Sequence, residues 1–114
     1  MHELSIAVNL VEIAVREATG AGSEQVSKVR LRIGALSGVV RDALEFSFDI
    51  AAGGTIVEGA ALEIEELPVV IHCPACDADR ELPDVFRFRC PVCGTPSADI
   101  RQGKELEITS LEIQ

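Results

Sequence analysis

Apolar residues near the start of the chain recur with the spacing of an amphipathic helix. From about residue 4 to residue 19, apolar side chains return at every third or fourth position, and charged side chains form a polar edge between them. The glycine-containing segment 19–22 ends this pattern. A second helical pattern covers about 43–51, between an opening near 40–42 and the pair Gly53-Gly54. The chain is therefore predicted to contain two helices.

Three other segments alternate apolar and polar residues, which is typical of half-buried strands. Between residues 28 and 35 the outward positions are basic, whereas around 62–65 and 105–109 they are acidic. Opposite charges favour these segments as neighbours in one sheet. We predict an α+β fold in which two helices cover the apolar side of a mainly antiparallel three-stranded sheet.

Residues 68–103 differ in composition from the rest of the 114-residue chain. They contain all four cysteines and all five prolines, with few large apolar side chains. Such a segment is too poor in apolar groups to form an independent core, so something else must hold it together. We therefore expect an inserted module over 68–103, interrupting a domain formed by 1–67 plus 104–114.

The cysteines form two C-x2-C pairs, Cys73 with Cys76 and Cys90 with Cys93, separated by 13 residues. This spacing lets two tight turns present four thiolates to one Zn²⁺ ion, so the module is expected to resemble a zinc ribbon. Four protein ligands leave no open coordination position, and such a site is structural rather than catalytic. Iron binding, dithiol redox chemistry and disulfides are the alternatives.

Three features next to the cysteines add detail to this module. The run from Phe86 to Arg89 predicts a hairpin strand whose phenylalanines cover the zinc site, in preference to stacking on nucleic-acid bases. Gly94 gives the turn after the second pair its backbone freedom, and Asp77 holds the equivalent place after the first. His72 precedes Cys73 and is either an exposed loop residue or a modulator of the zinc site.

The net charge of the chain limits the classes of partner that it can be expected to bind. Nineteen acidic residues against ten Lys and Arg give a formal net charge of −9. Phosphate backbones and anionic membrane surfaces would be repelled, so we expect neither nucleic-acid nor membrane binding. We find no secretory signal and no apolar stretch near the roughly 20 residues of a membrane span, and thus expect a cytoplasmic protein.

The first three residues offer a second, different set of metal ligands. The amine of Met1, the amide nitrogen of His2 and its imidazole can form fused chelate rings, and Glu3 adds an amide and a carboxylate. A nitrogen-rich planar set suits Ni(II) or Cu(II) better than Zn(II). A histidine in second position is by itself weak evidence, because most such residues are simply solvated.

Several segments in order carry a resemblance to a known family. They are the start Met-His-Glu-Leu-Ser, the strand and turn over 29–38, the strand over 59–64, the paired CPxC knuckles and the closing Gly-Lys-Glu-Leu over 103–106. Together they closely resemble the HypA family of nickel-insertion accessory proteins of [NiFe]-hydrogenase maturation. The resemblance spans essentially the whole chain.

The resemblance implies a metallochaperone that transports Ni²⁺ and contains structural Zn²⁺. It places nickel on His2 with the amine of Met1 and neighbouring backbone, and it leaves open whether Glu3 is a direct ligand. It assigns the nickel site to the domain formed by 1–67 plus 104–114. The zinc ligands that it implies are Cys73, Cys76, Cys90 and Cys93.

The same resemblance implies partners, namely a HypB-type GTPase and the hydrogenase large-subunit precursor, and some relatives also serve urease. The chain itself has two lysines, and neither closes a phosphate-binding GxxxxGK[ST] loop. We expect no enzyme activity, and a monomer or a homodimer. The main alternative is a zinc-ribbon protein-interaction module without an exchangeable metal, followed by a dithiol oxidoreductase.

Overall fold

The computed structural model describes residues 3–114, which form two helices and six strands. Their contacts divide the chain into two compact units. Unit 1 takes in the described part of Met1–Leu31 together with Gly38–Glu65 and Glu107–Gln114, and unit 2 takes in Arg32–Ser37 and Glu66–Leu106. In chain order the elements are α1 (Glu3–Gly20), β1 (Val26–Gly34), α2 (Arg41–Ala52), β2 (Ala61–Leu67), β3 (Val70–Cys73), β4 (Ala78–Glu81), β5 (Ile100–Gln102) and β6 (Leu106–Ile113).

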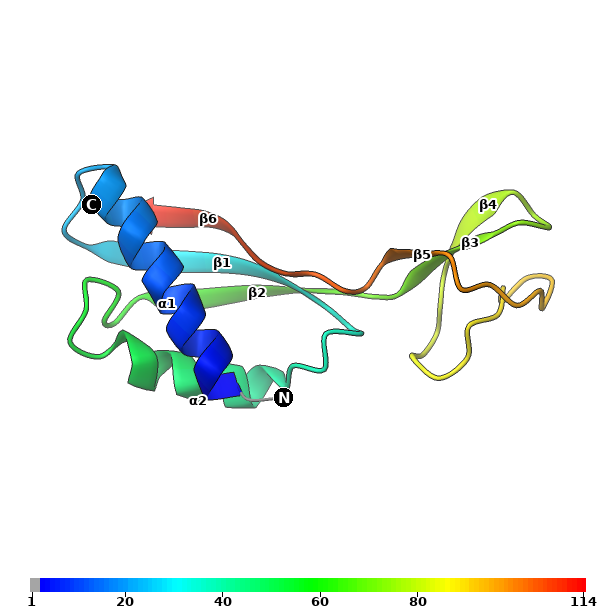
Figure 1. Cartoon of the computed structure of the whole chain (residues 1–114), viewed down its shortest axis with the longest axis horizontal. Coiled ribbons are helices and arrows are strands. Elements are labelled where there is room, and N and C mark those ends of the chain that lie inside the picture. Colours follow the sequence, from blue (N-terminus) through cyan, green and yellow to red (C-terminus); the bar gives the residue numbers. More distant parts are fainter. Residues whose placement is uncertain (1–2) are drawn as a thin grey trace. The chain divides into compact units, whose positions relative to one another are not determined.

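The helices of unit 1 follow the apolar pattern that predicted them. In α1 the buried positions recur at helical spacing, and in α2 the side chains of Leu44 and Phe48 are almost completely buried. The two helices pack against each other, as Figure 1 shows. Within the described residues neither helix combines the length and apolarity that a bilayer crossing needs. The predicted helices are therefore both present, and α1 is buried along one face only.

The sheet of unit 1 has the strand order β2-β1-β6, so the predicted α+β class with a three-stranded sheet and two helices is confirmed. Buried and more exposed residues alternate along β1 as expected, because Val29 and Leu31 are buried whereas Lys28 and Arg30 are more exposed. The outer face carries the predicted ion pairs, because the carboxylate of Glu63 lies 3.0 Å from both Lys28 and Arg30.

The direction of β2 differs from the expected mainly antiparallel arrangement. The pairing of Gln25 with Gln114 and of Arg30 with Ser110 makes β6 antiparallel to β1. Val26, by contrast, pairs with Ile56 and Arg30 with Glu63, so β2 runs parallel to β1 (Figure 1). The physical reason is the connection, since α2 forms a crossover between β1 and β2 as in a βαβ unit. The sheet is mixed.

Unit 2 contains the second sheet, in which β3 lies between β4 and β5 and pairs antiparallel with both. Its buried apolar cluster consists of Val69, Ile71 and Leu82, with a few partly buried side chains around it. A core of this size is too small to hold a fold without further support. The unit therefore depends on whatever its cysteines bind.

Candidate metal centre

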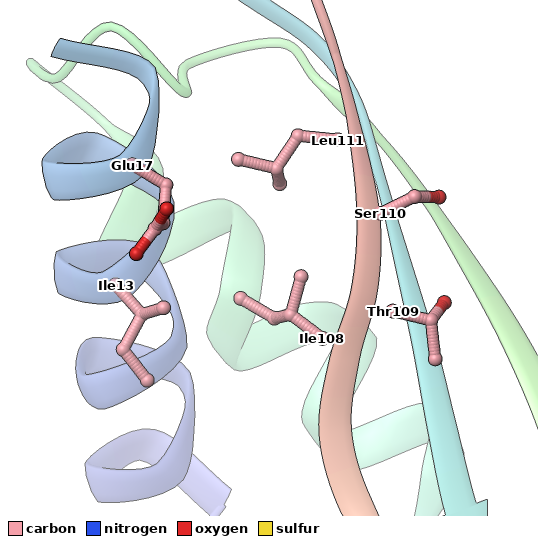
Figure 2. Close-up of a pocket in the computed structure, with 6 residues that line it drawn as sticks. All are labelled: Ile13, Glu17, Ile108, Thr109, Ser110 and Leu111. Carbon is pink, nitrogen blue, oxygen red and sulfur yellow. The ribbon is translucent and has the colours of Figure 1, made fainter. Parts of the chain in front are cut away.

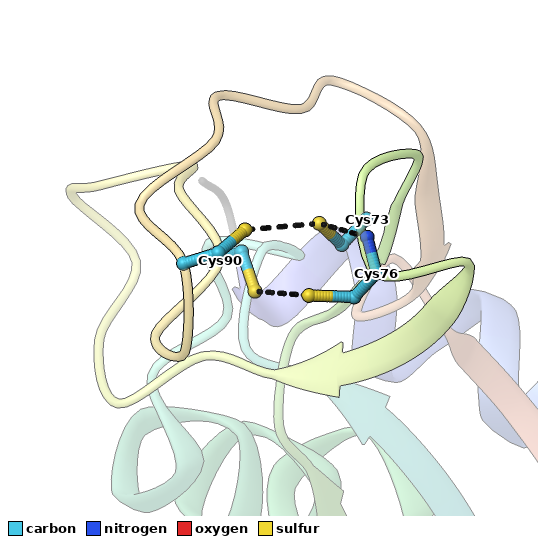
Figure 3. Close-up of side chains that lie close together, drawn as sticks. Cys73, Cys76 and Cys90 are labelled. Carbon is cyan, nitrogen blue, oxygen red and sulfur yellow. Dashed lines mark hydrogen bonds between the residues drawn. The ribbon is translucent and has the colours of Figure 1, made fainter.

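Two turns of unit 2 bring the sulfur atoms of all four cysteines together. The Sγ atoms of Cys73, Cys76, Cys90 and Cys93 lie within 4.8 Å of one another. The Cys73 and Cys93 sulfurs are 3.5 Å apart. The sulfurs of Cys76 and Cys90, which face each other in Figure 3, are 3.9 Å apart. Each short distance joins one sulfur of the first pair to one of the second. The four cysteines, which are free of disulfides, thus form one cluster.

These distances fit a tetrahedral metal ion and do not fit disulfides. A disulfide requires sulfurs about 2.05 Å apart. A tetrahedral site with Zn–S bonds of about 2.3 Å places its sulfurs about 3.8 Å apart. The distances of 3.5 and 3.9 Å lie on either side of that value. The donor set therefore has the number, chemistry and spacing of a closed thiolate metal site.

The backbone of each turn supports this arrangement. Within the first pair, the amide of Cys76 donates to the Cys73 sulfur at 3.4 Å. Asp77, which follows this pair, adopts a left-handed φ of 49°. After the second pair, the amide of Gly94 donates to the carbonyl of Cys90 at 2.8 Å, and Gly94 has a φ of 77°. Asp77 and Gly94 therefore share the left-handed backbone conformation. Glycine adopts this conformation most easily, and aspartate is among the few other residues that tolerate it.

The sulfurs differ strongly in their affinity for protons. Backbone amides of Cys93 and Val92 donate to Cys90 and lower the pKa of its thiol to about 6. Thr95 likewise lowers the pKa of Cys93. For Cys76, the Arg80 side chain lowers the pKa, but the neighbouring cysteines and burial outweigh it and raise the value to about 11. Four adjacent thiolates repel one another, and a divalent cation removes that repulsion.

Arg80 is a site residue that the cysteine spacing alone does not reveal. It lies on the same face of the β3–β4 hairpin as Cys73, and its Nε is buried without a hydrogen-bond partner in the described structure. The signal that could have located it is the alternation of β4, in which Arg80 is two residues after Ala78, the partner of Cys73.

His72 lies on the other face of the same hairpin. Its Nδ1 is 3.0 Å from a carboxylate oxygen of Asp79, and its Nε2 is 3.4 Å from one of Asp77. His72 is therefore a residue of strand β3 whose two ring nitrogens both contact carboxylates, and it is not an exposed loop residue. It contacts acids that flank the cluster, and the cysteines carry the ligand atoms.

The phenylalanines near the second pair do not behave as expected. Residues 86–89 form no regular strand, and Phe86 is 85% exposed, so it does not cover the cluster. The amides of Phe86 and Arg87 instead donate to the Asp84 carboxylate, which turns the chain locally. Phe88 packs against the small apolar cluster of the unit. The prediction that Phe86 covers the cluster is wrong, whereas a short hairpin is present in part, because residues 88–90 pair antiparallel with 95–97.

Two of the three residues predicted at the nickel site lie outside the described residues. Met1 and His2 lie outside the described residues, and Glu3 is the first residue of α1. The Glu3 carboxylate accepts a hydrogen bond of 3.2 Å from the amide of Val40, which immediately precedes α2. Glu3 therefore has a structural contact within unit 1.

Unit 1 also has an open cavity between α1 and β6, with a volume of about 370 Å³. Ile13 and Glu17 of α1 face Ile108 and Leu111 of β6, whereas Thr109 and Ser110 point away from the helix (Figure 2). The single carboxylate of this cavity, that of Glu17, is a poor metal site.

Among residues 3–114 the cysteine quartet is the one candidate metal-binding group. The four-cysteine cluster of unit 2 is therefore the candidate functional site.

A profile of a known family matches this chain over residues 1–113, and its description is "Hydrogenase/urease nickel incorporation, metallochaperone, hypA". The chain belongs to the HypA family. The resemblance that the sequence motifs indicated is thereby confirmed. HypA proteins are nickel metallochaperones for hydrogenase or urease, and the four-sulfur cluster of this HypA chain fits a structural zinc site.

Individual relatives agree with this assignment. The hydrogenase maturation factor HypA of Roseiflexus sp. (strain RS-1) is 55% identical over 114 residues, which cover 100% of this chain and 93% of the relative. That of Chloroflexus aggregans is 56% identical over 98% of both chains. The solution structure of the Ni metallochaperone HypA from Helicobacter pylori is similar in fold, with a TM-score of 0.70 at 24% identity over 99% of this chain and 97% of that one.

Proposed function

We propose that this protein binds Ni²⁺ through Met1, His2 and neighbouring backbone, carries it as cargo to a hydrogenase large-subunit precursor, and contains one structural Zn²⁺ ion. The observation that carries the proposal is the HypA-family match over residues 1–113. The names of the relatives, hydrogenase maturation factors, favour hydrogenase over urease as the recipient.

The zinc part of the proposal rests on the geometry of unit 2. Cys73, Cys76, Cys90 and Cys93 supply four thiolates at tetrahedral spacing. Bound zinc would supply charge neutralisation and cross-link the two turns, and it leaves no coordination position for a substrate. We assign residues 68–103 to this zinc-binding domain and 1–67 plus 104–114 to the nickel-binding domain. The two contact units support such a division.

The nickel part rests on donor chemistry and on the position of Glu3. The first amides of a helix have no intrahelical acceptor, so metal binding beside the start of α1 does not compete with helix hydrogen bonds. The Glu3 carboxylate, which accepts from Val40, links this site to the start of α2. We propose that Glu3 orients the site and that the nitrogen atoms of Met1 and His2 are the main ligands.

Nickel transfer then proceeds by ligand exchange without a change of oxidation state. Protonation of an imidazole, whose ordinary pKa is about 6.5, competes with Ni²⁺. The resemblance to the HypA family implies a HypB-type GTPase as the proposed partner, and the lack of a GxxxxGK[ST] loop in this chain agrees with nucleotide chemistry on a separate protein. The protein acts as a cytoplasmic carrier and not as an enzyme.

The test is a calorimetric titration of Ni²⁺ into untagged, zinc-loaded protein. We expect saturable binding in the wild type, its loss in His2→Gln, and its retention in His72→Gln, which removes the only other histidine. The affinity should fall between about pH 7.5 and pH 5.5 as the imidazole is protonated. Equal binding by the wild type and His2→Gln would contradict the nickel site and would favour a zinc-ribbon interaction module.

A further inference from the structure

Strand β6 lies at one edge of the sheet in unit 1. Its sheet neighbour within the described residues is β1 alone, so the backbone groups along its other side have no strand partner there. An unpaired edge is a template for pairing with a further strand. The same strand lines the open cavity of about 370 Å³ against α1. The edge and the cavity belong to elements that hold none of the four cysteines.

A β-bulge in β6 shapes this cavity. Ile108 and Leu111 both point toward α1, whereas the two residues between them both point away, so the usual alternation of a strand is broken (Figure 2). Both of these outward residues contact Arg30 of β1. Thr109 donates to the Arg30 carbonyl at 3.3 Å, and the Arg30 guanidinium donates to the Ser110 hydroxyl at 3.3 Å. Two residues opposite one are the pattern of a bulge, which re-aims side chains at a sheet edge.

The cavity is open to solvent and mainly apolar. Ile13 of α1, which is 40% exposed, faces Ile108 and Leu111 of β6 across it. Glu17 of α1 contributes the one charged side chain of the lining. The volume lies at the lower end of the range for ligand cavities, which is about 300–1,000 Å³. It has room for one large apolar side chain, and burial of such a side chain is favourable.

The charges around the cavity favour a basic partner. Helix α1 and strand β6 contain one basic residue, Arg16, against the acidic residues Glu3, Glu12, Glu17, Glu107 and Glu112. Glu112 is already paired with Arg30 at 2.8 Å. Glu17 and Glu107 are exposed, and neither has an ion-pair partner among residues 3–114. Lysine or arginine side chains on either side of an apolar one would therefore complement this surface.

We propose that the free edge of β6 and the cavity between α1 and β6 form a docking site for an extended segment of another protein, in which basic residues flank apolar ones. The segment adds a strand to β6, places one apolar side chain in the cavity, and brings basic side chains close to Glu17 and Glu107. In this mode of recognition main-chain hydrogen bonds supply affinity and side-chain pockets supply specificity. The inference goes beyond metal transport and rests on neither metal site.

Two other occupants agree less well with these observations. A second copy of this chain would pair β6 with β6 and bring the acidic residues of both strands, Glu107 and Glu112, side by side, where like charges repel. A small molecule would leave the strand edge unpaired, and Glu17 alone would orient it in the cavity. An extended basic segment uses the edge, the cavity and the carboxylates together.

The test is the binding of a short, fluorescein-labelled peptide in which lysine and leucine alternate. Its anisotropy is measured with the full-length, zinc-loaded protein. The control peptide has the same side chains but methylated backbone nitrogens, which cannot donate to a strand edge. We expect saturable binding of the first peptide, at least about tenfold tighter than that of the control, because two or three main-chain hydrogen bonds are lost. Amide NMR shifts on binding should be centred on β6 and on α1 around Ile13.

Ile13→Lys and Ile50→Lys form a matched pair of variants. Both isoleucines are exposed residues of a helix, at 40% and 57%, and of the two only Ile13 lines the cavity. Both substitutions add the same positive charge to unit 1. We expect Ile13→Lys to weaken peptide binding by at least about tenfold, because the cavity loses an apolar wall. Ile50→Lys should bind as the wild type does.

The carboxylates are tested separately. Glu17→Gln and Glu107→Gln should each weaken binding by about two- to fivefold, which is the range of an exposed ion pair. Glu58→Gln removes the same charge from the exposed turn after α2 and should leave binding unchanged. If Ile13→Lys does not fold, these three variants decide, and equal affinity among them overturns the proposal.

Four further results would also overturn it. Equal binding by Ile13→Lys and Ile50→Lys would mean that net charge alone holds the peptide. Equal binding of the methylated peptide would mean that no strand is added. A wild-type dimer in sedimentation that dissociates in Ile13→Lys would assign the surface to a second copy of the chain. Binding of hexylamine as tight as that of the peptide would assign the cavity to a small ligand.

Discussion

Asp77 shows how one residue is adapted to a strained turn. Its φ of 49° is disfavoured for most side chains, and its side chain is 93% exposed, so its ion pair with His72 is weak. The turn therefore needs a tolerant backbone more than it needs a carboxylate. We expect Asp77→Gly to change the stability of the zinc-loaded protein by less than about 1 kcal/mol and Asp77→Val to lower it by about 1–2 kcal/mol. Thermal unfolding followed by circular dichroism would measure both, and equal melting temperatures would contradict the backbone argument.

Gly34 is required for a different reason, which is the close approach of two backbone segments within unit 2. Its amide donates to the carbonyl of Glu105 at 2.8 Å, and the amide of Leu36 donates to that of Gly103 at 2.7 Å. A Cβ atom on Gly34 would overlap the Gly103 carbonyl, and rigid backbone cannot move aside as a side chain can.

We therefore expect Gly34→Ala to destabilise the protein by about 3 kcal/mol or more. Gly20→Ala is the control, because a Cβ at this last residue of α1 meets nothing within 4 Å. Urea denaturation followed by circular dichroism suits a chain that lacks Trp and Tyr. Similar midpoints for the two variants would show that the segments can separate without cost.

At the scale of elements, α2 carries most of its packing energy on one face. Phe48 is 2% exposed and Phe46 is 70% exposed, although both are phenylalanines in the same helix. Burial predicts that Phe48→Ala costs about 3–5 kcal/mol, because it leaves a cavity in the core of unit 1. Phe46→Ala should stay within about 0.5 kcal/mol of the wild type. The same urea experiment compares them, and a large loss in Phe46→Ala would contradict the orientation of α2.

The elements also show how far the sequence could predict the fold. The spacing of the apolar residues and the lengths of the segments predicted both helices and the three strands of unit 1, because an amphipathic pattern depends only on neighbouring residues. The direction of β2 was not predictable from charge, since the contacts of Glu63 with Lys28 and Arg30 are possible in either orientation. It follows instead from the crossover through α2, which is a property of the whole unit.

At the scale of the whole molecule, the site was predictable where its ligands form a motif. Two C-x2-C pairs at short separation are sufficient to predict a cluster, and the four sulfurs indeed converge. Arg80 could not be placed near the cluster in the same way, because its position depends on the pairing of β4 with β3. The exposure of Phe86 was equally hidden, since the turn made by Asp84 removes it from any strand.

Removal of the metal should affect the two units unequally. The buried apolar cluster of unit 2 consists of Val69, Ile71 and Leu82, whereas unit 1 has two packed helices over a sheet. A module with so few buried side chains loses its fold when the link between its turns is removed. With a strong chelator we expect the amide NMR signals of unit 2 to collapse toward random-coil positions, while those of unit 1 and the helical circular dichroism persist.

Readdition of one equivalent of Zn²⁺ should restore the dispersed signals of unit 2, and Mg²⁺ should not, because thiolates bind the softer ion. Cooperative loss of the helical signal on chelation would contradict this picture, since it would mean that unit 1 cannot fold without the metal. Retention of the helices would instead show that unit 1, whose first described residue is Glu3 in α1, folds independently of zinc. Nickel binding is nevertheless measured in the zinc-loaded protein, because zinc occupies the four thiolates that would otherwise compete for Ni²⁺.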